Sequence, residues 1–436
     1  MSCEIIPIIK NNSSLYSKFI TNAVNASPNV QKNFLNVTKN VAETIKKILI
    51  DADLIINLDY EPSNFWNINK NKTACFVDGG VDKCSIMSAA PLSIRAGSYI
   101  VNPSSELGKR ELFEESMVFL GDLYDAKNDL YELETDDFEE DQMLNKKKDG
   151  ARIIFEAATL VKHILLKRDF DYCFLHGPIE ATIMPFTVKG FPSFTKFAVE
   201  NIIPVYDKQK INNNDSRHFI NVYLECVKLI NKSHFPIYGI VETSTSAPYI
   251  KNLLFKYRGN KIISETDFRK ILSTIKKYKI TDSNLFEIIL KKNQALKPLI
   301  VKKQISGFNV TSGSQWEDKM DLFPNVSIGY IKVSDNQSPI RIESLQNPVN
   351  LKKDYEYILA TSKLLPNYGF PVGLSVVDKF AKIPNWMGKA SRNYYTTYFL
   401  KEAIKQKNPN TISVALKVLS KSNRSWLTRP TMRRFK

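Results

Sequence analysis

Residues 75–80 read "CFVDGG", a short apolar run that ends in an aspartate and two glycines. Two interpretations of Asp78 compete. Asp-Gly is a common hairpin-turn sequence, in which the carboxylate bonds only to nearby backbone. A carboxylate at the end of a central strand is also a group that can hold a divalent ion. The hexapeptide by itself favours the turn, so the rest of the chain has to decide between the two.

The neighbouring segments predict a sheet flanked by helices. Residues 73–80 and 83–102 indicate an antiparallel pair of strands that starts the sheet. Further strands and helices follow from the apolar spacing: a helix at 151–169, a buried strand within 170–186, a strand at 235–246, two helices within 264–292, a strand pair at 325–335 and 338–345, a helix at 351–365 and a helical segment at 373–406 interrupted near Pro384. The chain is therefore expected to be a mixed α/β protein with its candidate site at strand ends.

Three regions are expected along the chain. Residues 1–70 indicate an N-terminal helical region, 71–385 the core, and 386–436 a basic helical C-terminal segment. The core carries an acidic insertion at about 132–149, within the stretch "ELETDDFEEDQMLNKKKDG". Crowded carboxylates repel one another, so this insertion is expected to be an exposed loop rather than a metal site.

Composition limits the class of protein. The 436 residues are 43% hydrophobic and 24% charged, which predicts a folded, soluble chain of two or three lobes or one elaborated domain. No apolar run approaches the roughly 20 residues that span a bilayer, and no basic leader precedes the first apolar stretch, so we expect a cytoplasmic, unprocessed protein. Five cysteines without a CxxC pair support neither a disulfide framework nor a zinc knuckle.

Positive charge is concentrated at the C-terminal end. The formal net charge is +16, and residues 378–436 hold 14 Lys and Arg against two acidic residues, a local balance of +12. Aromatic residues lie among these cations: Trp386, Tyr394, Tyr395, Tyr398, Phe399, Trp426 and Phe435. Cations attract phosphate and aromatic faces stack on unpaired bases, so this end is predicted to bind nucleic acid. The alternative is a solvated helix with a basic tail, which can also bind acidic proteins.

The helix at 151–169 supplies a second candidate carboxylate. Arg152, Glu156, Thr159 and His163 fall on one stripe of this helix. Glu156 lies in an apolar stretch, where isolated carboxylates are seldom buried without a partner. Its alternative role is an ordinary surface pair with Arg152, which stabilises a helix by a few tenths of a kcal/mol. The following strand breaks at His176.

The order of these motifs resembles a known family. "FVDGG", "RIIFE", "LHGPI", "GIVETSTS", "IGYIKV", "PIRIE" and "GFPVGLSVVDKFA" resemble the NurA nuclease domain over about residues 73–385. The resemblance implies an RNase H-like fold and a manganese- or magnesium-dependent deoxyribonuclease that processes DNA ends in repair or anti-phage defence. It also implies a homodimer that docks on a HerA-like hexameric ATPase. Asp78 would be the metal ligand on the strand and Glu156 the ligand on the helix.

Two departures from the family pattern are opposite in kind. The family normally has aspartate where this chain has His176, and histidine where it has Asp378. An exchange within one site would keep two Asp, one Glu and one His as ligands, provided that both side chains face each other across a few Å. The alternative is independent drift in a protein that has lost cleavage. Glu242 stands where the family tends to carry lysine, which removes a cation or adds a carboxylate.

Several hard oxygen ligands must converge to hold a magnesium or manganese ion that hydrolyses phosphodiesters. We therefore expect Asp78, Glu156, His176 and Asp378 to be catalytic metal ligands. Arg341, Lys379 and Arg392 are expected to hold DNA, from their positions alone. The other histidines, His163, His218 and His234, are expected to be structural.

Other functions stay open at this point. One is a cleavage-deficient DNA-binding or clamp subunit of a motor complex, which keeps the basic surface without catalysis. Another is an RNase H-like enzyme that acts on RNA. No P-loop sequence occurs, so any ATP-driven movement must come from a partner.

Overall fold

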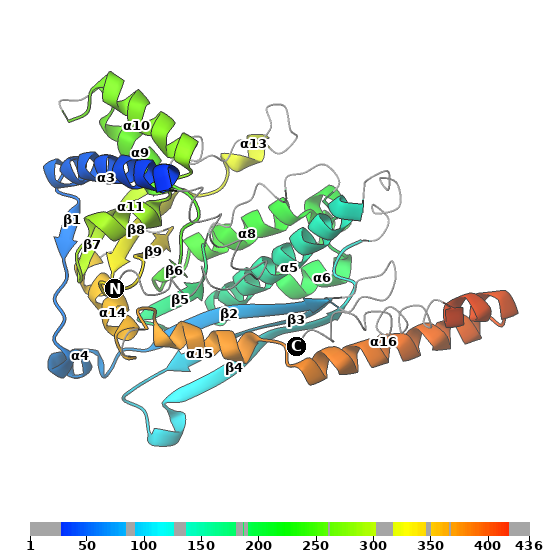
Figure 1. Cartoon of the computed structure of the whole chain (residues 1–436). Helices are drawn as coiled ribbons and strands as arrows, with labels where there is room; N and C mark the ends of the chain where they lie inside the picture. Colours follow the sequence, from blue (N-terminus) through cyan, green and yellow to red (C-terminus); the bar gives the residue numbers. More distant parts are fainter. Residues whose placement is uncertain are drawn as a thin grey trace, which may run out of the picture.

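The computed structural model describes residues 28–83, 92–125, 137–179, 186, 191–259, 262–301, 317–345, 350–365 and 368–417. Its described strands form one nine-stranded mixed sheet in the order β1-β7-β8-β9-β6-β5-β2-β3-β4 (Figure 1). The strands are β1 (Ile55–Asn57), β2 (Ala74–Lys83), β3 (Leu92–Val101), β4 (Glu111–Gly121), β5 (Tyr172–His176), β6 (Ile237–Val241), β7 (Gln294–Val301), β8 (Val326–Lys332) and β9 (Ile340–Ser344).

One half of the sheet has a distinctive strand order. β2, β3 and β4 form an antiparallel meander, and β5 and β6 then lie parallel to β2 on its other side. Helix α5 (Asp137–Leu165) connects the meander to β5, and α8 (Phe219–Asn231) precedes β6. Three antiparallel strands, a helix and two parallel strands are the arrangement expected for an RNase H-like core, so this prediction is confirmed.

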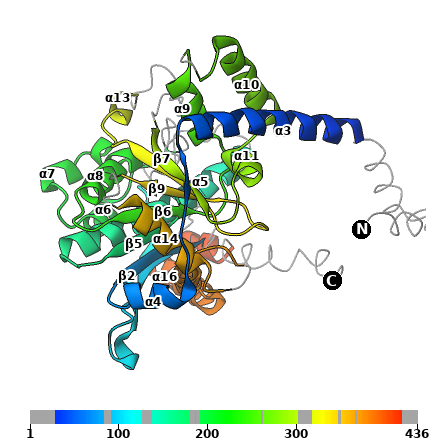
Figure 2. The same ribbon diagram turned by 90° about the vertical axis from the view of Figure 1, so that its left-hand side faces the viewer.

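The other half of the sheet is antiparallel from β6 through β9, β8 and β7 to β1. It is accompanied by helices whose apolar residues share one core cluster with the strands. These helices are α3 (Pro28–Asp51), α9 (Pro248–Tyr257), α10 (Glu265–Tyr278) and α11 (Asp282–Ile289). Figure 2 shows α3 extending outward beside α10 and α11.

The central strand β2 is buried on both faces. Cys75 and Val77 belong to the core under α5 and α8, whereas Ala74 and Phe76 belong to the core on the opposite face. Successive strand residues point to opposite faces, so a strand covered on both sides reads as a continuous apolar run. The second face is covered by α14 (Leu351–Ser362) and α15 (Val372–Ala381).

The remaining elements lie around this framework. They are α4 (Pro62–Asn69), α6 (Lys196–Ile202), α7 (Lys208–Ile211), α13 (Glu317–Met320), α16 (Asn385–Lys405) and the short helices η1 (Leu107–Lys109) and η4 (Asp215–Arg217). Residues 409–417 are also helical. Helix α16 follows α15 and extends beyond the edge of the sheet (Figure 1). None of the helices in the described part of the chain combines the length and the apolar character that a membrane crossing requires.

Most of the expected elements are present, with one correction. The β2–β3 and β8–β9 pairs, the two helices within 264–292 and the break near Pro384 are confirmed. The expected N-terminal helical region contains α3 and α4 and also supplies β1 to the sheet edge.

The prediction of a loop at the acidic insertion is wrong for residues 137–149, which form the first half of α5. Acidic residues at the start of a helix interact favourably with its dipole, so this block favours a helix N-terminus. Residues 132–136 lie outside the described part.

Candidate metal centre

Asp78 lies inside β2 and is not part of a hairpin turn. The strand continues to Lys83, and Asp78 is paired with Gly97 of β3. On the other side of β2, however, the ladder with β5 ends at the pair Val77–Leu175. Asp78 is therefore the first residue beyond the parallel ladder. The turn interpretation of "CFVDGG" is therefore wrong. The prediction that Asp78 lies at a strand end is correct only for the pairing of β2 with β5, because the pairing with β3 continues to Lys83.

His176 is the last residue of β5 and faces Asp78. Its Nδ1 atom is 2.9 Å from Oδ2 of Asp78, although the two residues are 98 positions apart in the chain. The next residue, Gly177, has φ = 121°, a backbone conformation that favours glycine. The chain therefore turns away directly after His176 and leaves the imidazole at the end of the strand.

Asp378 on α15 completes a group of three. Asp78, His176 and Asp378 each offer one ligand atom, and these atoms all lie within 4.8 Å of one another. The condition for the proposed exchange, that His176 and Asp378 face each other across a few Å, is therefore met. Lys382, one helical turn after Asp378, lies 2.6 Å from its Oδ2 atom. This lysine was not among the residues predicted from sequence, although its spacing of four residues from Asp378 on a helix would have indicated it.

The two glycines after Asp78 explain why nothing bulky follows it. A β-carbon at Gly79 would lie 3.0 Å from Cγ and 3.2 Å from Oε1 of Glu156, which approaches from α5. Gly80 leaves room on the opposite face for the backbone of α15 at Ala381. Neither glycine serves a turn. Each lets a helix that carries a candidate ligand come close to β2.

Glu156 is buried beside the group of three. Its side chain bonds to Nη1 of Arg152 at 2.8 Å, and the residue is only 4% exposed. Burial raises the pKa of Glu156 to about 8; the Arg152 charge opposes this shift and the Asp78 charge adds to it. Glu156 thus interacts electrostatically with Asp78, but it is not a member of the group whose ligand atoms lie within 4.8 Å. Its role as a fourth ligand stays a prediction.

The carboxylates also act on His176. Burial lowers the pKa of His176, but the hydrogen bond and charge of Asp78, together with the charges of Glu156 and Asp378, raise it above its ordinary value. Negative charge therefore dominates at this point, as a cation site requires. Two carboxylates and one imidazole fit manganese, which accepts both oxygen and nitrogen ligands; magnesium prefers oxygen ligands.

The three cations expected to hold DNA differ in their surroundings. Arg341 on β9 has a side chain only 14% exposed, and its Nε donates to Glu343 at 2.8 Å. Burial lowers the pKa of Arg341, but the charge and hydrogen bond of Glu343, together with Tyr330 and Asp282, raise it above its ordinary value, so the guanidinium stays charged within this pair. Lys379 is exposed on α15. Arg392 belongs to α16, and its side chain lies outside the described part.

The other histidines make contacts within the fold. His163 is fully buried, with Nε2 3.0 Å from Oγ of Ser98. His218 caps the N-terminus of α8, and burial lowers its pKa to about 4. His234 contacts the carbonyl of Arg168. These contacts agree with the structural roles expected for all three.

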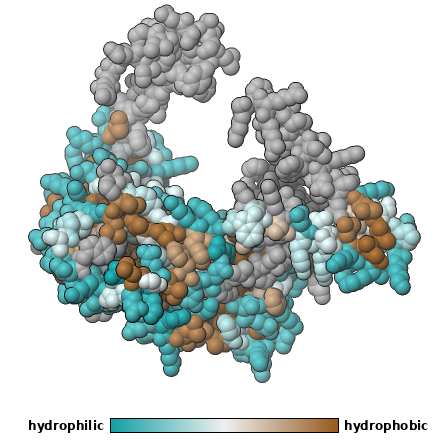
Figure 3. All heavy atoms as spheres, turned by 90° about the horizontal axis from the view of Figure 1, so that it is seen from below, coloured by the Kyte–Doolittle hydropathy of each residue, from teal (hydrophilic) through white to brown (hydrophobic). Residues whose placement is uncertain are grey.

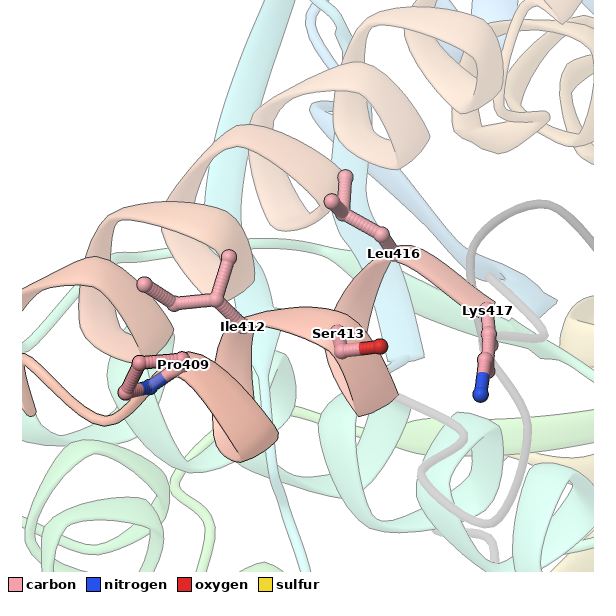
Figure 4. Close-up of a pocket in the computed structure, with 5 residues that line it drawn as sticks. All are labelled: Pro409, Ile412, Ser413, Leu416 and Lys417. Atoms are coloured by element: carbon pink, nitrogen blue, oxygen red, sulfur yellow. The ribbon is translucent and has the colours of Figure 1, made fainter.

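Helix α16 presents aromatic side chains to solvent. Trp386, Tyr394, Tyr398 and Phe399 are exposed, and the rings of Tyr394 and Tyr398 stack with centroids 6.5 Å apart. In the view from below, hydrophobic residues also gather on the helix at 409–417 (Figure 3). A surface hollow of about 600 Å³ on this helix is lined by Pro409, Ile412, Ser413, Leu416 and Lys417 (Figure 4). None of these five residues belongs to the metal-ligand group. Trp426 and Phe435 lie outside the described residues, as does the side chain of Tyr395.

Comparisons with known proteins give structural matches only. No protein-family model and no curated protein matches the sequence. The structure of the NurA nuclease from Sulfolobus solfataricus matches 90% of this chain and 98% of its own, with a TM-score of 0.50 and 11% identity. A second NurA structure matches 89% and 99% of the two chains, with a TM-score of 0.45 and 10% identity. A structure of NurA bound to dAMP and manganese matches 82% and 93%, with a TM-score of 0.43 and 11% identity. The chain is thus similar in fold to the NurA nuclease over nine-tenths of its length.

Proposed function

We propose that this chain is a manganese-dependent deoxyribonuclease that processes DNA ends. One observation carries the proposal: Asp78, His176 and Asp378, from two strands and a helix, bring ligand atoms within 4.8 Å of one another on a NurA-like fold. Carboxylates so close together repel one another unless a cation lies between them. The group therefore has the composition and the spacing of a divalent-metal site.

Each residue has a distinct role in this site. Asp78 and Asp378 supply negative oxygen ligands, and the contact with Asp78 fixes the orientation of the His176 ring. Arg152 orients the carboxyl group of Glu156, which holds a proton at neutral pH because of its burial. When bound, the metal ion polarises the phosphodiester and lowers the pKa of a water molecule.

The partners are proposed from charge and from the resemblance. Residues 378–436 hold 14 Lys and Arg against two acidic residues, and exposed aromatic side chains lie on α16; both features support contact with DNA. The resemblance further implies a homodimer and a HerA-like hexameric ATPase as partner. The lack of a P-loop in the sequence agrees with a separate motor.

Cleavage of linear DNA by the purified full chain tests the function. Single- and double-stranded substrates are incubated with Mn²⁺, Mg²⁺ or a chelator, with and without the candidate ATPase. We expect digestion with Mn²⁺, none with the chelator, and none by Asp78→Ala or Asp378→Ala variants that stay folded. Asp282→Asn is a control, because Asp282 is buried, as Asp78 is, but bonds to backbone amides at the start of α9. Full cleavage by Asp78→Ala would reject the proposal.

A cleavage-deficient DNA-binding subunit is the second candidate. It is favoured by the ion pair of Asp378 with Lys382, which already neutralises one carboxylate of the group without a metal, and by the proton that burial keeps on Glu156. DNA that stays intact in every condition, while the protein still binds it, would support this candidate. A parallel digest of RNA distinguishes a deoxyribonuclease from an enzyme that acts on RNA.

A further inference from the structure

A buried carboxylate on β9 contacts the segment that follows His176. The side chain of Glu343 is 2% exposed, and its Oε2 atom accepts a hydrogen bond from the backbone N–H of Ile179 at 2.9 Å. Ile179 is three residues after His176. The carboxylate reaches this amide across β6, the strand between β9 and β5.

A glycine in β6 makes this contact possible. Gly239 is the partner of Glu343 in the β6–β9 ladder. A β-carbon at Gly239 would lie 2.7 Å from the carbonyl oxygen of Gly177 and 2.8 Å from the nitrogen of Ile179. The segment 177–179 therefore folds back onto β6 in space that a side chain at residue 239 would fill.

Two other bonds hold the same segment. The hydroxyl of Tyr223, which is buried on α8, donates to the carbonyl of Ile179 at 2.5 Å. The N–H of Gly177 donates to the carbonyl of Ile240 at 2.9 Å. Segments that leave a strand are usually its most mobile neighbours. Here, backbone groups on both sides of Pro178 are hydrogen-bonded to β9, α8 and β6. These bonds restrict the segment that follows His176 and so hold His176 in position.

Arg341 aligns the Glu343 carboxylate. Its guanidinium donates to Oε1 of Glu343 through two nitrogens, and Oε2 is left to accept from Ile179. A hydrogen bond from an amide to an ionised carboxylate is stronger than one to a neutral acceptor. Arg341 is thus engaged in orienting Glu343.

We propose that Glu343, oriented by Arg341, is a positioning residue that holds His176 against Asp78 and Asp378 through the segment 177–179. The proposal rests on the proposed function, because it assumes that these three residues bind a divalent ion. Glu343 itself lies on β9, which carries none of these three residues, and acts through the backbone of Ile179. Residues that orient a metal ligand without binding the metal themselves typically contribute about 10- to 100-fold to metal affinity.

Mn²⁺ titration of the full chain, followed by the signal of free Mn²⁺, tests the proposal. Glu343→Ala and Gly239→Ala are expected to raise the Mn²⁺ dissociation constant at least about tenfold. Glu343→Gln keeps an oxygen that can accept from Ile179 and is expected to recover part of this loss. Lys332→Met is the matched control, because it removes another buried charge of the sheet, which pairs with Glu287 of α11, and leaves the segment 177–179 untouched. An equal loss of affinity in Lys332→Met would overturn the proposal.

Histidine resonances of the metal-free protein give a second readout. The chain has four histidines, so a His176→Gln variant identifies the resonance of His176. Glu343→Ala and Gly239→Ala are expected to shift this resonance and to leave those of His163 and His218 in place. An unshifted His176 resonance, with unchanged Mn²⁺ affinity, would overturn the positioning role. If the unmodified chain binds no Mn²⁺ but its His176 resonance shifts in both variants, the proposed function fails and the positioning of His176 stands.

Discussion

Gly80 and Ala381 are in direct backbone contact. A β-carbon at residue 80 would lie 2.3 Å from the carbonyl oxygen of Ala381, far inside normal contact distance. On β3, a β-carbon at Gly97 would likewise lie 2.9 Å from the ring of Phe380. Glycines on two adjacent strands therefore let α15 lie directly on the sheet. This close packing brings Asp378 to Asp78 and His176.

Gly80→Ala is predicted to weaken metal binding by displacing α15. The added methyl group meets a rigid backbone carbonyl, so the helix must shift and carry Asp378 away from the other ligands. We expect the Mn²⁺ dissociation constant to rise at least about tenfold and the free energy of unfolding to fall by about 1–3 kcal/mol. Gly108→Ala is the control, because nothing lies within 4 Å of a β-carbon there. Unchanged Mn²⁺ affinity in a folded Gly80→Ala variant would contradict this account of the helix contact.

Exchange of His176 and Asp378 is predicted to preserve the metal site. Because their ligand atoms lie in one group with that of Asp78, the double variant His176→Asp/Asp378→His keeps the same set of ligands. We expect each single variant to lose Mn²⁺ affinity and the double variant to recover most of it. A double-mutant cycle measures this coupling as a departure from additivity. Losses that simply add would show that the two residues do not share an ion.

The apolar run before Asp78 was enough to place this residue on a strand. The reason for the two glycines that follow it could not be predicted from the sequence. Asp-Gly in a hairpin and Asp-Gly beside a close-packed helix have the same local sequence. Only the positions of Glu156 and Ala381, far away in the chain, distinguish them. The approach of His176 to Asp378 likewise depends on packing between β5 and α15. A resemblance in motif order indicated these residues, but sequence alone contains no distance.

Other differences follow from short-range rules. Arg341 and Glu343 are two residues apart on β9 and therefore share one face of the sheet. This spacing would have indicated the ion pair with Glu343; contact of Arg341 with DNA stays a prediction. Strand β4 escaped prediction because its "ELFEESMVFLG" sequence carries several glutamates, which are common on the edge strand of a sheet.

The stability of the metal-free protein is predicted to depend on the titration of Glu156. Its pKa is about 8 in the folded chain, against an ordinary value of 4.5. Between these values the Glu156 side chain binds more protons in the folded state than in the unfolded state, so its contribution to stability falls as the pH rises from about 4.5 to about 8 and is constant on either side. Glu156→Gln removes this contribution.

Urea denaturation in the presence of a chelator, between pH 5 and pH 9, measures the effect. The free energy of unfolding of the unmodified chain, relative to that of Glu156→Gln, is expected to fall by roughly a few kcal/mol over this range. Saturating Mn²⁺ is expected to reduce the fall, because a nearby cation favours the ionised carboxylate. A pH-independent difference between the two proteins would show that the carboxyl group of Glu156 is ionised throughout.

Lys382 is predicted to compete with the metal ion for Asp378. Its ammonium lies 2.6 Å from the carboxylate, yet the lysine side chain is largely exposed, so the bond is weak. Lys382→Met is expected to lower the Mn²⁺ dissociation constant by about two- to threefold. Lys379→Met removes the same charge from the same helix and is expected to have a smaller effect. Weaker Mn²⁺ binding in Lys382→Met would instead assign this lysine a supporting role in the site.

The stacked pair Tyr394 and Tyr398 on α16 is predicted to bind unpaired bases. The two residues are 63% and 53% exposed, and their rings are almost parallel, at 14°. Aromatic stacking contributes about 1–3 kcal/mol per base, so Tyr394→Ser/Tyr398→Ser is expected to weaken binding of single-stranded DNA at least about tenfold. Duplex DNA, whose bases are already stacked, is expected to bind almost as before.

The matched control for this pair is Tyr394→Phe/Tyr398→Phe, which keeps both aromatic faces and removes only the hydroxyl groups. Its affinity for single-stranded DNA is expected to equal that of the unmodified chain, as measured by fluorescence anisotropy. The salt dependence of binding is expected to stay the same in both double variants, because it reports the phosphate contacts of Lys and Arg. Equal weakening for single-stranded and duplex DNA in the serine variant would show that α16 contributes to binding by its overall shape or charge and not by base stacking.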